Sequence, residues 1–142
     1  MTKGNMFLVI AAAGLALAGC NKAESPAEVQ HDVTNAQAEA QRDVTDAQAD
    51  AQENMADAQK DVADAQADND ANDVADQARD ASETAAQGDF KVAVARAEAT
   101  HKVATEKCEA LSGAAQEDCK TRADNDLDNA KRAAETRRDG SG

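Results

Sequence analysis

The stretch "DVTNAQAEAQRDVTDAQADAQE", residues 32–53, decides the fold of this chain. It holds two copies of an eleven-residue unit, which begin at Asp32 and Asp43. Apolar residues recur there and on either side in steps of three and four, the spacing of one face of an α-helix. They are Val29, Val33, Ala36, Ala40, Val44, Ala47, Ala51, Met55, Ala58, Val62 and Ala65. Eleven residues over three turns is ~3.67 residues per turn, which predicts a nearly straight helix.

The repeat has a clear start and an interruption. Ser25 suits the N-cap position and Pro26 the first helical position, so residues 20–26 are expected to form a tether. A long alanine-rich helix is predicted over residues 27–87. The apolar stripe breaks at residues 68–70 and resumes on another face, which predicts a kink or local fraying there. If straight, this helix would extend roughly 90 Å.

The composition predicts an all-α protein without a large core. The chain has no Trp or Tyr and only two Phe, and most of its apolar residues are Ala. Small side chains bury little area, so a deep substrate pocket is not expected. No nucleophile–base set, P-loop or Rossmann glycine pattern occurs in the sequence. We therefore expect no catalytic residues, no cofactor and no enzymatic activity.

The charge is negative and uneven. The formal net charge is −13, and residues 20–90 hold 18 acids against 4 bases, whereas residues 91–142 hold 10 of each. Negative charge repels the phosphate backbone, so nucleic acid is not an expected partner. The change falls near Gly88, which we interpret as a boundary between two segments.

Two alternatives to a single solvated helix remain open for the repeat. One is self-association through the alanine stripe. The other is partial disorder, because Asp is a poor residue for a helix interior and the net charge is high. Ala, Gln and Glu favour a helix.

The second segment, residues 89–138, is predicted to be a helical hairpin, followed by a flexible tail at 139–142. Gly113 suits the turn, because it can adopt a left-handed conformation. Mirror pairing about that turn places Cys108 opposite Cys119, so we predict a disulfide between them. Free thiols or intermolecular bonds are the alternatives.

A metal site is the weaker interpretation of this region. His101 and Cys108 share a helix face, with Glu98 nearby. Zinc usually takes four ligands, often in CxxC or HxxxH pairs, and neither pair occurs here. We expect no metal.

The N-terminus has the parts of an export signal: Lys3, an apolar run over residues 7–18, and small residues at its end. The run is too short to span a membrane as a helix. Leu17-Ala18-Gly19-Cys20 resembles the lipobox of bacterial lipoproteins; an ordinary secretory signal is the alternative. The resemblance implies removal of residues 1–19, cleavage between Gly19 and Cys20, and acylation of Cys20 with palmitate-type chains. Lipid would then be the contact with the membrane.

The mature chain resembles the small helical-repeat lipoproteins of the murein lipoprotein type, which share the lipobox, the adjacent helical repeat and the scarcity of aromatic residues. That resemblance, with Asn21 in place of an aspartate, implies the periplasmic face of the outer membrane. Those proteins attach to peptidoglycan through a C-terminal lysine, whereas the last lysine here is Lys131. The four bases between Lys131 and Arg138 either contact peptidoglycan carboxylates or anionic lipid, or stabilise the end of the last helix.

These observations favour a non-enzymatic, lipid-anchored envelope protein that acts as a helical spacer or interaction module. The spacer is expected to hold the disulfide hairpin away from the membrane. Its expected partners are the membrane, through Cys20, and peptidoglycan or another envelope protein. The alternative is a stress-protective hydrophilic repeat protein, of the kind that protects against desiccation or osmotic stress.

Overall fold

The computed structural model describes residues 22–68 and 70–140 of the chain. These residues form three helices, which are α1 (Pro26–Asp68), α2 (Ala71–Cys108) and α3 (Ala114–Asp139). The predicted all-α fold class is confirmed. Cys20 and Gly19, the predicted lipidation and cleavage residues, lie outside the described residues.

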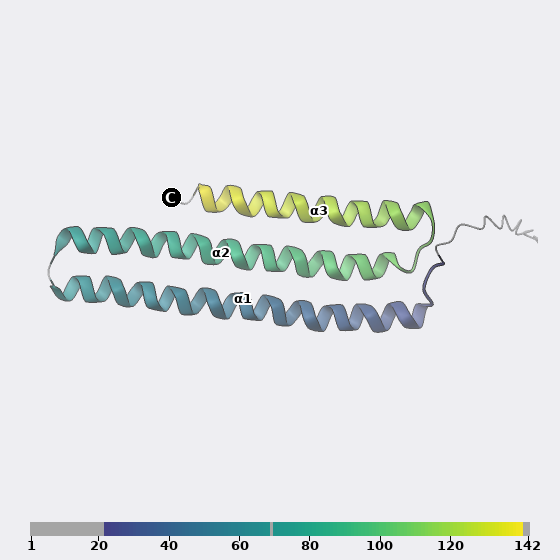
Figure 1. Ribbon diagram of the computed structural model, residues 1–142, viewed down its shortest axis with the longest axis horizontal. Helices are drawn as coiled ribbons and strands as arrows, with labels where there is room; N and C mark the ends of the chain where they lie inside the picture. Colours follow the sequence, from purple (N-terminus) through teal and green to yellow (C-terminus); the bar gives the residue numbers. More distant parts are fainter. Residues whose placement is uncertain (1–21, 69, 141–142) are drawn as a thin grey trace, which may run out of the picture.

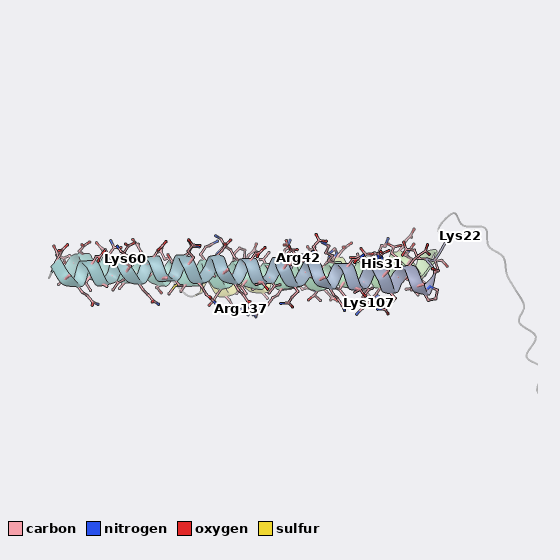
Figure 2. All side chains as sticks on the ribbon, turned by 90° about the horizontal axis from the view of Figure 1, so that it is seen from below. Lys22, His31, Arg42, Lys60, Lys107 and Arg137 are labelled. Atoms are coloured by element: carbon pink, nitrogen blue, oxygen red, sulfur yellow. A yellow bond between two sulfur atoms is a disulfide. The ribbon has the colours of Figure 1, made fainter. Side chains whose placement is uncertain are left out.

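The three helices lie side by side in one layer, with α2 in the middle (Figure 1). Consecutive helices run in opposite directions. Helix α2 contacts both neighbours, whereas α1 and α3 do not contact each other within the described residues. Seen along the layer, the molecule is a thin plate (Figure 2). A plate of three helices encloses no central core, because only α2 has a helix on each side.

Helix α1 begins as the sequence predicts. The Ser25 hydroxyl accepts a hydrogen bond from the backbone N–H of Glu28 at 3.3 Å, and the Glu28 carboxylate accepts one from the Ser25 N–H at 3.0 Å. This reciprocal pair is a capping box, which satisfies two N–H groups that the first turn leaves unpaired. Pro26 occupies the first helical position, where its missing N–H has no cost.

The predicted apolar stripe is the face of α1 that packs against α2. Every position of the stripe from Val29 to Ala65 is buried or half-buried. Val33, Ala36, Ala40 and Ala65 are the fully buried members. Since this face already contacts α2, the alanine stripe joins two helices of one chain in this structure.

Helix α1 ends at Asp68, and α2 begins at Ala71 and contacts α1. The prediction of one helix over residues 27–87 with a kink or local fraying is therefore wrong. Asp70 caps α2, because its side chain accepts hydrogen bonds from the N–H groups of Asn72 and Asp73 at 2.9 and 3.3 Å. A new helix therefore starts there and returns along α1. The reach of the molecule falls from the expected ~90 Å to the length of α1, whose 43 residues rise about 64 Å.

The predicted boundary at Gly88 does not exist in the structure, because Gly88 is a buried residue inside α2. A Cβ atom built on Gly88 would lie 3.1 Å from the Cβ of Ala51. The glycine therefore lets α1 and α2 approach closely at this level. The charge balance of the sequence changes near Gly88, but the helix continues through this residue, and the structural role of Gly88 is its packing against Ala51.

Helices α2 and α3 form the predicted antiparallel hairpin, with limits that differ from residues 89–138. The hairpin uses all of α2, and α3 continues through Asp139, the first residue of the predicted tail. Gly113 lies in the turn as expected, with φ 58°, and directly precedes the first residue of α3. No described helix has both the length and the hydropathy that a membrane span requires.

Candidate functional site

The predicted cysteine pair lies at one end of the plate. Cys108 is the last residue of α2 and is 1% exposed, and Cys119 lies in the second turn of α3. Their sulfur atoms form a disulfide, with the two Cα atoms 5.7 Å apart. The turn between the helices brings the two residues together, as mirror pairing about Gly113 predicts. The disulfide therefore fixes the start of α3 against the end of α2.

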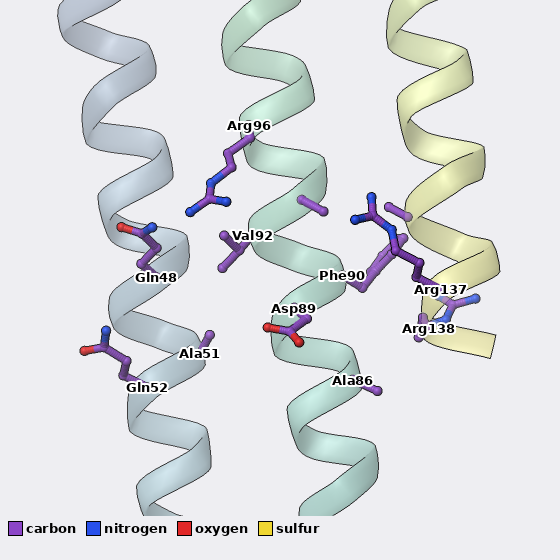
Figure 3. Close-up of a pocket in the computed structure, with 12 residues that line it drawn as sticks. Gln48, Ala51, Gln52, Ala86, Asp89, Phe90, Val92, Arg96, Arg137 and Arg138 are labelled. Atoms are coloured by element: carbon purple, nitrogen blue, oxygen red, sulfur yellow. The ribbon is translucent and has the colours of Figure 1, made fainter. Parts of the chain in front are cut away.

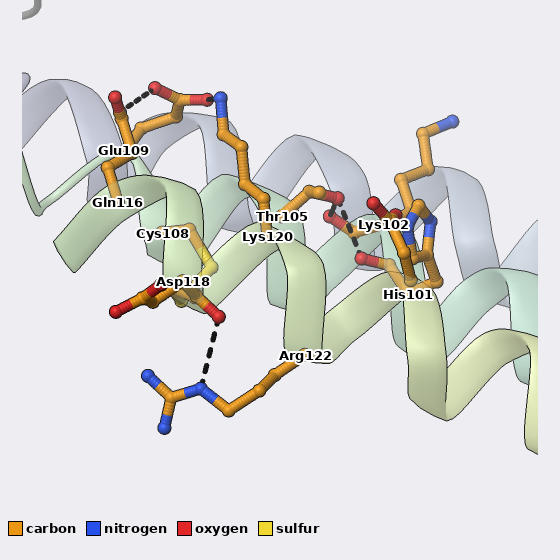
Figure 4. The surroundings of a disulfide bond; sticks show 11 residues. His101, Lys102, Thr105, Cys108, Glu109, Gln116, Asp118, Lys120 and Arg122 are labelled. Carbon is orange, nitrogen blue, oxygen red and sulfur yellow. Dashed lines mark hydrogen bonds and ion pairs between the residues drawn. A yellow bond between two sulfur atoms is a disulfide. The ribbon is translucent and has the colours of Figure 1, made fainter. Parts of the chain in front are cut away.

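Glu109 connects three segments around this disulfide (Figure 4). Its carboxylate pairs with Lys120 Nζ at 2.5 Å and accepts a hydrogen bond from Gln116 Nε2 at 2.6 Å. Gln116 is 2% exposed, so this bond satisfies a buried amide. The backbone carbonyl of Glu109 accepts a hydrogen bond from the N–H of Glu24 at 2.9 Å. The residues before α1 are thereby attached to the turn between α2 and α3.

The Glu24 carboxyl group is in an unfavourable environment. Its Oε2 atom is enclosed and has no hydrogen-bond partner within the described residues. Burial raises the pKa of Glu24, and the negative charges of Asp32, Glu109, Glu28 and Glu106 raise it further. By contrast, the hydrogen bonds from Ser25 lower the pKa of Glu28, because they favour its charged form. The disulfide end of the plate therefore holds one carboxyl group, that of Glu24, whose charged form is disfavoured.

Ion pairs tie each outer helix to α2. Between α2 and α3, His101 Nε2 lies 2.6 Å from Asp124 Oδ1, and Glu98 Oε1 lies 2.7 Å from Lys131 Nζ. These pairs stay within two residues of the predicted mirror register. Between α1 and α2, Glu39 pairs with Lys102 at 2.5 Å, and this pair lowers the pKa of Glu39. All these pairs are partly exposed, so each adds little stability.

The structure separates the residues of the weaker metal interpretation. His101 contacts Asp124, Glu98 contacts Lys131, and Cys108 is in the disulfide. Across residues 22–68 and 70–140 there is no group of three or more His, Cys, Asp or Glu side chains arranged to hold a metal ion.

A groove crosses the plate midway along α2 (Figure 3). Its volume is about 640 Å³. All three helices contribute to its lining, and its charged residues are Asp89, Arg96, Arg137 and Arg138. The guanidinium carbon of Arg138 lies 4.6 Å from the ring centre of Phe90, a cation–π contact. We call this the cationic groove.

The sequence reasoning did not identify the cationic groove. In the sequence, Arg137 and Arg138 belong to a basic C-terminal run, and Arg96 belongs to no motif. One signal was present, since mirror pairing about Gly113 places Phe90 opposite Arg137. Arg96, by contrast, joins the groove through the contact of α1 with α2, which no local pattern reveals.

Comparisons with protein-family models, with curated proteins and with solved structures found no match for this chain. Two regions of the described chain are candidate functional sites: the disulfide end, with the attached segment before α1, and the cationic groove.

Proposed function

We propose that this chain is a non-enzymatic, lipid-anchored protein of the bacterial cell envelope, which acts as a structural or interaction module. The observation that carries the proposal is the tetrapeptide Leu17-Ala18-Gly19-Cys20 after a short apolar run and a positively charged start. Acylation of Cys20 would supply the membrane contact. Stable attachment needs more than one acyl chain, and a lipobox cysteine receives more than one.

The contact between Glu24 and Glu109 indicates which end of the plate would lie near the membrane. Glu24 follows Cys20 by four residues and lies against the turn between α2 and α3. A lipid on Cys20 would therefore hold the disulfide end near the membrane. This orientation reverses the expectation that the disulfide hairpin stands away from the membrane.

The opposite end of the plate, where α1 turns into α2, would then project from the bilayer. It is strongly acidic, with eleven acids and two bases over residues 50–83. Anionic headgroups repel such a segment, which favours the outward direction. The module would hold its acidic end about 64 Å from its anchored end, the rise of α1.

The paired helices favour a structural module over a stress-protective chain. A protectant of the predicted kind is a coil in dilute solution and gains helix on drying. Here the apolar stripe of α1 is packed on α2, Gly88 fits closely against Ala51, and a disulfide closes the second hairpin. Circular dichroism in dilute buffer separates the two functions, because the module is helical there and the protectant is not.

Metabolic labelling with a palmitate analogue tests the anchor. Wild-type protein should take up the label and fractionate with membranes, and Cys20→Ala should do neither. Cys119→Ser is a matched control, because it removes a cysteine and leaves the lipobox unchanged. Wild-type protein that stays unlabelled and soluble in the periplasm would overturn the proposal.

A further inference from the structure

The two faces of the α1–α2 pair differ in charge. In α1, each of the eleven positions of the stripe that packs against α2 is followed by Gln, Thr or Ala, and nine of the eleven are preceded by Asp or Glu. Successive residues of an α-helix point about 100° apart, so these two sets lie on opposite sides of the packed stripe. Gln48 and Gln52 from the first set line the cationic groove, whereas Asp57 and Asp61 from the second line a groove on the other face. We call the side with the uncharged set the glutamine face.

Helix α2 contributes mainly small side chains to the glutamine face. Helical spacing from the residues of α2 that line the cationic groove gives this set, which is Ala75, Ala78, Ser82, Ala86 and Ala93. The charged residues that α2 adds are Asp89, Arg96 and Lys107. None of these three forms an ion pair within residues 22–68 and 70–140. Figure 3 shows Gln48 and Gln52 on α1 and the charged Asp89 and Arg96 on α2.

The glutamine face is hollowed along the seam where α1 and α2 meet. Next to the cationic groove lies a second hollow of about 770 Å³, and Arg96 lines both. Apolar side chains from both helices line this second hollow, among them Val44 and Val103. Gln37 and Gln41 line it on the α1 side. The seam therefore leaves apolar surface in contact with water, and helices laid over it would bury that surface.

The charge pattern favours a second copy of this chain as the partner. A chain with a net charge of −13 repels its own copies, and contact through the acidic side of α1 would bring carboxylates together. Contact through the glutamine face instead leaves the carboxylates of both α1 helices on the outside. A two-fold dimer also needs a self-complementary patch, because the same surface is used by both copies. The glutamine face meets this need, since α1 supplies long amide side chains and α2 supplies small ones.

We propose that two copies of this chain associate through their glutamine faces, with the two-fold axis along the seam between α1 and α2. Helix α1 of each copy then lies on α2 of the other, and four helices enclose the apolar surface of the seam. Neighbouring helices in this bundle are antiparallel, as in other four-helix bundles. The disulfide ends of both copies lie at the same end of the dimer, which agrees with the proposed orientation at the membrane.

The register of α1 and α2 places long side chains of one copy over small ones of the other. Gly88 lies against Ala51, so Gln48 and Gln52 fall at the level of residues 86–93 of the second copy. Their amides donate hydrogen bonds as well as accept them, so they serve both the Asp89 carboxylate and each other. The interface does not use Cys20, and it stands or falls separately from the proposed function.

Photocrosslinking in cells that produce the full chain tests the interface. A photoreactive benzoylphenylalanine replaces Gln41 on the glutamine face or, as the control position, Asp57 on the acidic side. Two copies with different C-terminal tags are produced together, so that a crosslinked homodimer carries both tags. We expect a doubly tagged band from position 41 and at least tenfold less of it from position 57.

A pair of double variants separates the interface from total charge. Gln48→Glu with Gln52→Glu adds two negative charges to the glutamine face and should reduce the doubly tagged band tenfold or more. Asn35→Asp with Asn54→Asp is the matched control, because it adds the same charge on the acidic side and should leave the band unchanged. Circular dichroism should show that both double variants keep the wild-type helix content.

Four results would overturn the proposal. They are no doubly tagged band from position 41, an equal band from position 57, a crosslink from position 41 to a different protein in place of the second copy, and equal loss in the two double variants.

Discussion

The backbone N–H of Glu24 donates a hydrogen bond to the carbonyl oxygen of Glu109 at 2.9 Å, which joins the start of the described chain to the turn before α3. The two residues are far apart in sequence, but the start of α1 and the turn between α2 and α3 lie at the same end of the plate (Figure 1). Glu24 is four residues after Cys20 in the sequence, so this contact links the segment after Cys20 to the disulfide end of the plate. The disulfide, the enclosed Glu24 carboxyl group and the segment before α1 are all gathered there.

The disulfide should stabilise the packing of α3 on α2 and should not affect the packing of α1 on α2. Replacing Cys108 and Cys119 with Ser removes a cross-link that is worth about 2–4 kcal/mol. Within residues 22–68 and 70–140, α3 contacts only α2, so loss of the disulfide should leave the α1–α2 pair in place. Hydrogen exchange should show α3 amides losing protection while the α1 amides keep theirs. Equal loss in all three helices would contradict this prediction.

Gly88 should tolerate no large side chain. Gly88→Leu places atoms where a Cβ already lies 3.1 Å from the Cβ of Ala51. Overpacking of this kind costs about 1–3 kcal/mol of unfolding free energy. Urea denaturation measures the change. Gln87→Leu is the control, because Gln87 is exposed and its replacement should change stability by less than about 0.5 kcal/mol. Equal effects of the two variants would refute the close approach of α1 and α2.

Glu24 should reduce stability at neutral pH. Its pKa is raised in the folded chain, so the folded state binds more protons than the unfolded state as the pH rises above the ordinary value of 4.5. Stability therefore falls across that range. Glu24→Gln should raise the melting temperature at pH 7 and leave it unchanged well below pH 4.5. A variant that is less stable than wild type at pH 7 would show that the carboxylate is stabilising.

Glu39, unlike Glu24, should increase the stability of the fold at neutral pH. Lys102 lowers its pKa, so the stabilisation is present above the ordinary pKa of 4.5 and is lost as the pH falls through the lowered value. Glu39→Gln should therefore lower the melting temperature at pH 7 by a small amount, with no difference in acid. If the effect comes from this pair, it disappears in a Lys102→Met background. An unchanged effect in that background would assign it to another contact.

The sequence predicted the local features of this fold and missed its long-range ones. The stripe from Val29 to Ala65, the Ser25 cap and the Cys108–Cys119 pairing depend on helical spacing and on one short turn. The reversal at residues 68–70 was misread as a kink, because an interrupted stripe marks the break but not the direction of the next helix. Gly88 was misread for a similar reason, since its role depends on Ala51 in another helix.

The candidate site was predicted only in part. The disulfide followed from mirror pairing, whereas the cationic groove combines residues from three helices. Arg96 and Arg137 become neighbours of one groove only after both antiparallel contacts are formed. A sequence pattern does not contain that information, because neither arginine belongs to a repeat or a motif.

The proposed orientation of the plate at a membrane is tested most directly by tryptophan quenching. The chain has no tryptophan, so Leu111→Trp and Ala71→Trp each introduce a single reporter, at the disulfide end and at the opposite end. The acylated protein is placed in vesicles with a nitroxide on the lipid headgroup. If the disulfide end lies near the bilayer, quenching is strong for Trp at position 111 and almost absent at position 71. Equal quenching at both positions, or stronger quenching at 71, would contradict the proposed orientation.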